Sequence, residues 1–192
     1  MFIDYLTLML INMAAGLAIL ALFVLKYLNG DRKKLAPGLL VSGFVAVVTG
    51  LYEIFTWPII SSYNIPFGEM SVLYGVLMLG GAIAVLSDWE LLSLGIYATF
   101  AGAAAIVLGI RMYTLKMTSE PLVATIGFVL TGLMGVLSLP VYYLRRFKVV
   151  LILATIALFG AAAIWTLFAF LGYWAHLDAF SKWVPATMPP AK

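Results

Sequence analysis

The chain has 192 residues, of which 65% are hydrophobic and only 10% are charged, and its mean hydropathy is +1.12. About a quarter of the residues of a soluble domain are charged, so this composition excludes a soluble globular protein and predicts an integral membrane protein. The formal net charge of +3 is too small to indicate nucleic-acid binding, and the lack of cysteine excludes disulfides, thiolate metal ligands and thiol catalysis.

Six apolar stretches, separated by charged or Pro/Gly-rich breaks, are each long enough to cross a membrane. About 20 helical residues span a hydrocarbon core about 30 Å thick. Lipid allows only helices or closed barrels, and these stretches lack the alternation of barrel strands. We therefore predict an all-α transmembrane bundle over residues 1–174, followed by a short interfacial tail over residues 175–192. The predicted spans are Tyr5–Leu28, Pro37–Trp57, Met70–Leu86, Leu91–Ile110, Leu122–Tyr142 and Val149–Trp174.

Two polar residues mark the first span. Asp4 precedes it, and Asn12 lies within it. We expect Asp4 to lie in the outer water layer. The amide of Asn12 is expected to hydrogen-bond to a neighbouring helix, a contact worth about 1 kcal/mol in a membrane.

Glu53 lies near the end of the second span, where an ionised carboxylate is costly unless it is paired or hydrated. At helical steps it shares a stripe with small residues such as Ala46 and Gly50, which favours a position facing the bundle interior. One hypothesis is that Glu53 organises this end of the bundle by accepting hydrogen bonds or by balancing Arg111. The alternative is that its carboxylate simply reaches interfacial water.

Arg111 ends the fourth span on the same side of the membrane as Glu53. The two side chains are predicted to pair or to hold a polar ligand in an outward-facing pocket, although Arg111 could instead extend from its helix end into water. The whole predicted polar cluster consists of Glu53, Arg111, Asp4, Glu69 and Asn12.

The loops carry unequal positive charge. Lysine and arginine concentrate at residues 26–34 and 145–148, whereas residues 58–69 contain neither. The positive-inside rule then places the two basic loops in the cytoplasm and both termini outside it, in a multi-pass cell-membrane protein. The outer connection Ser61–Gly68 either caps a pocket or forms an ordered surface loop.

A weak internal repeat relates the even-numbered spans. Gly43 and Gly50 in the second span have the same separation as Gly102 and Gly109 in the fourth, and the string that begins at Gly102 recurs at Gly160. One explanation is a bundle of repeated hairpins that run in the same direction. The other is that close packing in lipid favours small residues in every helix.

No motif identifies a cofactor, a metal or a reaction. His176 is the only histidine, so two histidines of one chain cannot ligate a haem. No metal site is predicted, because the carboxylates lack the spacing of a known site. Nucleotide-binding, serine-hydrolase and zinc-hydrolase motifs are also missing.

Several short strings resemble a family of small polytopic prokaryotic membrane proteins that is catalogued as a domain of unknown function. They are Phe2–Met9, Ala36–Gly38, Phe55–Pro58 and Ser62–Glu69. The resemblance extends from Phe2 to Ser138 and weakens through the sixth span and the tail. It implies a bacterial or archaeal cell membrane and no assigned activity, so it carries over no catalytic residue.

Two classes of function fit this sequence. The favoured one is a non-catalytic helical subunit or scaffold of a larger membrane complex, because the middles of several spans lack the polar residues that carriers use. The alternative is a small carrier or channel-like protein with an outward-facing polar pocket around Glu53 and Arg111. An enzyme is less favoured than either. The expected partners are the lipid bilayer and other membrane-protein subunits.

Overall fold

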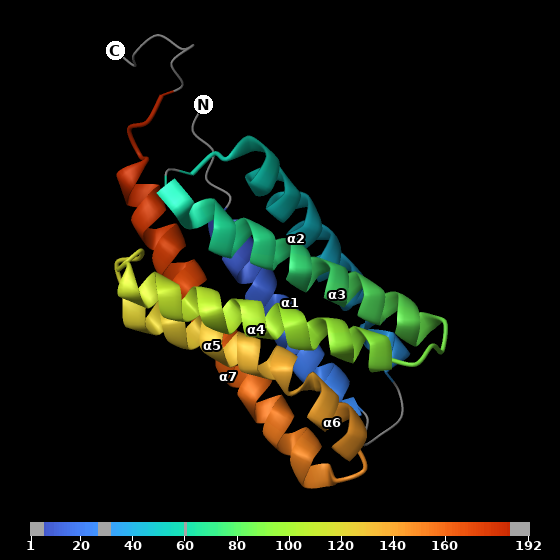
Figure 1. Ribbon diagram of the computed structural model, residues 1–192. Coiled ribbons are helices and arrows are strands. Elements are labelled where there is room, and N and C mark those ends of the chain that lie inside the picture. The colour runs from blue at the N-terminus through green and yellow to red at the C-terminus, as the bar shows by residue number, and fades with distance from the viewer. Residues whose placement is uncertain (1–5, 27–31, 60, 185–192) are drawn as a thin grey trace.

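The computed structural model describes residues 6–26, 32–59 and 61–184. Within these residues the chain forms seven α-helices and no strand (Figure 1), which confirms the all-α prediction. Three short elements, η1 (Lys33–Leu35), η2 (Ser61–Tyr63) and the π-helical η3 (Ile65–Glu69), join or extend these helices. The α-helices are α1 (Leu6–Lys26), α2 (Ala36–Thr56), α3 (Met70–Leu86), α4 (Leu92–Thr114), α5 (Pro121–Val136), α6 (Ser138–Leu144) and α7 (Lys148–Ala179).

The predicted fifth span is a broken helix. Five helical stretches are individually long and apolar enough to cross a membrane, and α5 with α6 forms a further pair that bends by 43° at Leu137. The predicted span Leu122–Tyr142 is therefore divided between two helices, and this bent pair brings the candidate spans among the described residues to six. Pro140 accounts for the bend, because it has no N–H to donate to the carbonyl of Val136 and its ring clashes with that carbonyl in a regular helix.

The last helix extends beyond its predicted end. α7 continues through Ala179, so the first residues of the predicted tail, including His176, belong to the same helix as the sixth predicted span. At 1.5 Å per residue, its 32 residues measure about 48 Å, well above the thickness of the hydrocarbon core of about 30 Å. One end of α7 must therefore leave the apolar layer.

Three closely packed helix pairs build the bundle: α2 with α3, α4 with α5, and α1 with α7. Further contacts of α1 with α2, α3 with α4 and α5 with α7 join the pairs into a closed ring, and Figure 1 shows these long helices lying side by side. Because α2 and α4 both start at the basic end of the bundle, the α2–α3 and α4–α5 hairpins run in the same direction.

Glycine explains the close approach within two of these pairs. A Cβ on Gly43 of α2 would lie 2.8 Å from the carbonyl oxygen of Gly75 in α3, and a Cβ on Gly102 of α4 would lie 2.9 Å from the Cα of Gly135 in α5. Gly43 and Gly102, paired by the sequence repeat, thus have the same role in their hairpins. Gly160 does not share it, since nothing lies within 4 Å of the position of its Cβ.

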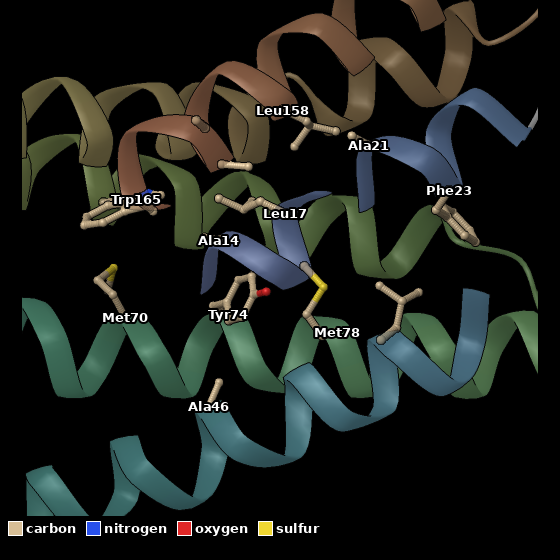
Figure 2. Packing of buried hydrophobic residues seen from close by; sticks show 14 of the residues in the cluster. Ala14, Leu17, Ala21, Phe23, Ala46, Met70, Tyr74, Met78, Leu158 and Trp165 are labelled. Atoms are coloured by element: carbon tan, nitrogen blue, oxygen red, sulfur yellow. The ribbon is translucent and has the colours of Figure 1, made fainter. Parts of the chain in front are cut away.

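Larger side chains face the centre of the ring. Figure 2 shows Met70, Tyr74 and Met78 projecting from α3 toward α1 and α7, with Leu17 of α1 and Trp165 of α7 directed into the same region. All five are nearly inaccessible to solvent. Small residues therefore form the contact between the two helices of a hairpin. Long and aromatic side chains form the contacts between one helix pair and the next.

Candidate functional site

Glu53 is completely buried, with an exposed fraction of 0%. Its Cβ and Cγ pack against Gly68 of η3, where an added Cβ would lie 3.2–3.3 Å from them. Within the part of the chain that the structure describes, neither carboxylate oxygen has a hydrogen-bond partner. Glu53 lies on the inner face of its helix, as its sequence pattern predicted, and the organising role of its carboxylate stays a prediction.

The connection between α2 and α3 covers Glu53. Its Asn64 is fully buried: the amide donates to the carbonyl of Ile59 at 2.6 Å and accepts from the Ile59 N–H at 3.2 Å. These two hydrogen bonds hold the start of the connection together. The π-helical turn that follows places Gly68 in contact with α2. Ser61–Gly68 is therefore an ordered segment whose last residue packs on the buried side chain of Glu53.

Arg111 does not pair directly with Glu53. It is exposed and donates to the Thr114 hydroxyl at 3.3 Å, while α2 and α4 are not neighbours in the ring. The predicted direct pair was therefore wrong, because similar depth in two spans does not make their helices adjacent. Glu69 is exposed at the end of η3, and Asp4 lies outside the described residues.

Asn12 makes the interhelical contact expected of it. Its amide donates to the carbonyl of Ser42 in α2 at 2.9 Å. The Ser42 hydroxyl in turn lies 2.8 Å from the hydroxyl of Tyr74 in α3, beside Gly16. These polar contacts join three helices. Ser42 and Tyr74 were not predicted from the sequence, because neither residue is unusual in an apolar helix.

A cavity of about 580 Å³ lies at the centre of the ring. This volume falls within the usual range of small-molecule sites, about 300–1,000 Å³. Every α-helix contributes to its lining, which is almost wholly apolar. Along α7 the lining extends from Val150 to Trp165, or about 22 Å at 1.5 Å per residue. No periodicity in the sequence could reveal this space, because it depends on how the three helix pairs meet.

Aromatic rings line one end of this central cavity. Phe128 of α5 stands edge-to-face against Trp165 of α7 at 5.2 Å between ring centroids, and Phe67 of η3 packs on Phe128 at 5.8 Å. The indole N–H of Trp165 donates to the Thr131 hydroxyl at 2.9 Å. The indole therefore presents its apolar surface to the cavity while its polar atom is satisfied.

Charged side chains gather at the opposite, basic end. α3 ends in a Schellman-type turn, in which Asp88 has φ 56° and the Trp89 N–H bonds to the Ala84 carbonyl at 2.7 Å. This turn directs Asp88 to Lys33, which lies 2.7 Å away. It also presents Glu90, which accepts the Tyr142 hydroxyl of α6 at 2.6 Å.

A second, smaller cavity of about 250 Å³ occupies this basic end. Two of its lining residues, Leu91 and Arg145, also line the central cavity, so the two spaces adjoin. The polar site predicted from the sequence lies at the opposite end of the bundle. The sequence signal for the small cavity is the acidic turn around Asp88 and Glu90, which lies opposite two basic loops. The polar residues lining the small cavity are Arg32, Asp88, Glu90 and Arg145.

Comparison with known proteins yields a family without an assigned activity. Residues 1–179 match the family described as "Protein of unknown function (DUF981)". The match includes the sixth span, which the resemblance noted in the sequence covered only weakly. Neither the curated proteins nor the solved structures contain a significant match. Among the described residues, no group of three or more His, Asp or Glu side chains could hold a metal ion.

Proposed function

The chain belongs to the DUF981 family of multi-span helical membrane proteins of unknown function, and from this premise we propose that it is a binding subunit that holds an apolar molecule in its central cavity. The observation that carries the proposal is the size and apolar lining of that cavity. A non-catalytic role as a subunit of a larger membrane complex agrees with this activity.

The polar groups along the central cavity already have partners. The Tyr74 hydroxyl is bonded to Ser42, the Trp165 N–H to Thr131, and the Ser138 hydroxyl to the carbonyl of Gly95 at 2.9 Å. A buried water needs two to four polar partners, and these groups offer few further bonds. A hydrocarbon chain suits the space better than water, because it restores the dispersion contacts that an unfilled apolar cavity lacks.

The carrier alternative depends on an outward-facing polar pocket around Glu53 and Arg111, and the positions of these two residues do not favour it. Glu53 is fully buried, with Gly68 packed on its Cβ and Cγ, and Arg111 lies exposed on a helix that does not adjoin α2. A ligand could bind the Glu53 carboxylate only after the structure opened around this buried side chain. The binding-subunit proposal requires no such opening.

Replacing Gly81 with leucine tests the proposal. Gly81 lines the central cavity, and no atom lies within 4 Å of the position of its Cβ, so the new side chain fills the cavity without a backbone clash. We expect Gly81→Leu to lose most of the apolar molecules that co-purify with wild-type protein in mild detergent, measured by mass spectrometry per mole of protein.

Gly160 provides the matched control. It is also a helical glycine with open space around it, but it is exposed on α7 and does not line the cavity. Gly160→Leu should therefore retain the wild-type amount of bound apolar molecules. Equal retention by the Gly81 and Gly160 variants would contradict binding in the central cavity.

The orientation proposed from the basic loops is tested by cysteine labelling. Ser61 and Ser87 are exposed at opposite ends of the hairpin formed by α2 and α3, and the natural chain contains no cysteine. With the basic end in the cytoplasm, a membrane-impermeant thiol reagent should label Ser61→Cys on intact cells and label Ser87→Cys only after lysis. The reverse pattern would invert the topology.

A further inference from the structure

We infer that the central cavity and the small polar cavity form one site for a lipid with an anionic phosphate headgroup, its chain in the central cavity and its phosphate at Arg145 and Arg32. The inference rests on the proposed binding of an apolar molecule and adds its chemical class. The reason is that the apolar central cavity adjoins the charged small cavity at the basic end of the bundle.

The junction is made by residues common to both cavities. Leu91 and Arg145 line each of them, so the two cavities adjoin at these side chains, and a bound molecule that reaches from one cavity to the other passes beside them. The central cavity has the aromatic rings of Phe128 and Trp165 at its other end. A bound molecule must therefore be amphiphilic, with its polar group at the Arg145 end.

The charge around the polar cavity favours an anion. Arg32 and Arg145 line it together with Asp88 and Glu90. Lys33 lies 2.7 Å from Asp88 and neutralises it, and the sequence of residues 26–34 and 145–148 contains seven basic side chains against one acidic side chain. The basic loops supply additional positive charge nearby, as in sites for anionic lipid headgroups between transmembrane helices.

Arg145 presents its guanidinium to both cavities. Its guanidinium lies over the Tyr142 ring at 4.0 Å and 4.0 Å from the Glu90 carboxylate. The second distance permits ion pairing but exceeds that of a hydrogen bond. A guanidinium has five N–H donors in a plane that matches a phosphate, and stacking on Tyr142 fixes that plane.

Competitive lipid binding tests the inference. Purified protein is titrated in detergent with phosphatidylglycerol or with phosphatidylcholine of identical acyl chains, and bound lipid is measured by native mass spectrometry. Wild-type protein should bind phosphatidylglycerol about tenfold more tightly, because both headgroups carry the phosphodiester but phosphatidylcholine adds a trimethylammonium cation, which Arg32 and Arg145 repel. Arg145→Gln should weaken the binding of both lipids and reduce the preference for phosphatidylglycerol.

Two controls separate the headgroup from the chain. Arg146→Gln removes an adjacent arginine that stacks on Phe147 and lines neither cavity, so it should keep the preference. Gly81→Leu should weaken binding of both lipids. Equal affinity of wild-type protein for the two lipids, with weaker binding of both to Gly81→Leu, would overturn the anionic-headgroup inference while leaving the proposed function intact.

Free phosphate is the other source of the same headgroup chemistry. Inorganic phosphate alone should bind wild-type protein weakly, because it makes no contact in the central cavity. Suppose that phosphate raises the melting temperatures of wild-type protein and Gly81→Leu equally, and that phosphatidylglycerol raises them no further than phosphate does. The site then holds a free anion, and the lipid inference is wrong. Unchanged binding of both lipids to Gly81→Leu would instead refute the proposed function itself.

Discussion

Gly102→Ala is expected to lower the melting temperature of the purified protein by several degrees, whereas Gly160→Ala should leave it unchanged or raise it slightly. Both glycines begin the same Gly-Ala-Ala-Ala-Ile string. Only their surroundings differ: a Cβ on Gly102 would lie 2.7 Å from the backbone nitrogen of Val136, whereas one on Gly160 would meet nothing within 4 Å.

Whether the added methyl group lowers or raises the melting temperature depends on the atoms that surround it. A backbone atom cannot rotate away as a side chain can, so α4 and α5 must separate to admit the methyl group at Gly102. Overpacking of this kind costs about 1–3 kcal/mol. At Gly160 only the intrinsic helix preference for alanine remains, worth up to about 1 kcal/mol in favour of the variant.

Thermal unfolding in one detergent, followed by circular dichroism, compares the two variants directly. The equivalent position in the other hairpin, Gly43, should behave like Gly102, since its Cβ would meet the Gly75 carbonyl oxygen at 2.8 Å. Equal melting temperatures of Gly102→Ala and Gly160→Ala would contradict close glycine packing between α4 and α5.

Glu53→Met is expected to stabilise the protein by about 1–3 kcal/mol. Both carboxylate oxygens of Glu53 are buried with no hydrogen-bond partner among the described residues, and leaving a buried polar group unpaired costs about this much in protein mutational data. Methionine has a similar length and no strong polar atom, so it can fill the same space beside Gly68. The gain should appear as a higher melting temperature in detergent.

Glu53→Gln is the control at the same position. It keeps the shape and the unpaired polar atoms, so its melting temperature should stay near that of the wild-type protein. If methionine and glutamine both destabilise the protein, the Glu53 carboxylate has a partner in the membrane, such as a bound ligand or water. A stabilised Glu53→Met that has lost a binding activity would show that this carboxyl group is retained for function at a cost in stability.

The sequence by itself determined the parts of the structure that depend on local chain and solvent. Long apolar stretches must become helices in lipid, because their backbone groups have no other hydrogen-bond partners. The positions of α1, α2, α3 and α4 follow from this rule. The inward direction of Glu53 and the interhelical bond of Asn12 also followed from local pattern, since small residues share the stripe of Glu53 and an amide in an apolar span needs a partner.

Only the tertiary structure decided which helix faces which. Glu53 and Arg111 end their spans on the same side of the membrane, yet the order of helices around the ring separates α2 from α4. The central cavity likewise arises because glycine draws helices together within each hairpin while large side chains hold the hairpins apart. Contacts between distant segments fix these distances, and the spacing of residues along one helix does not contain them.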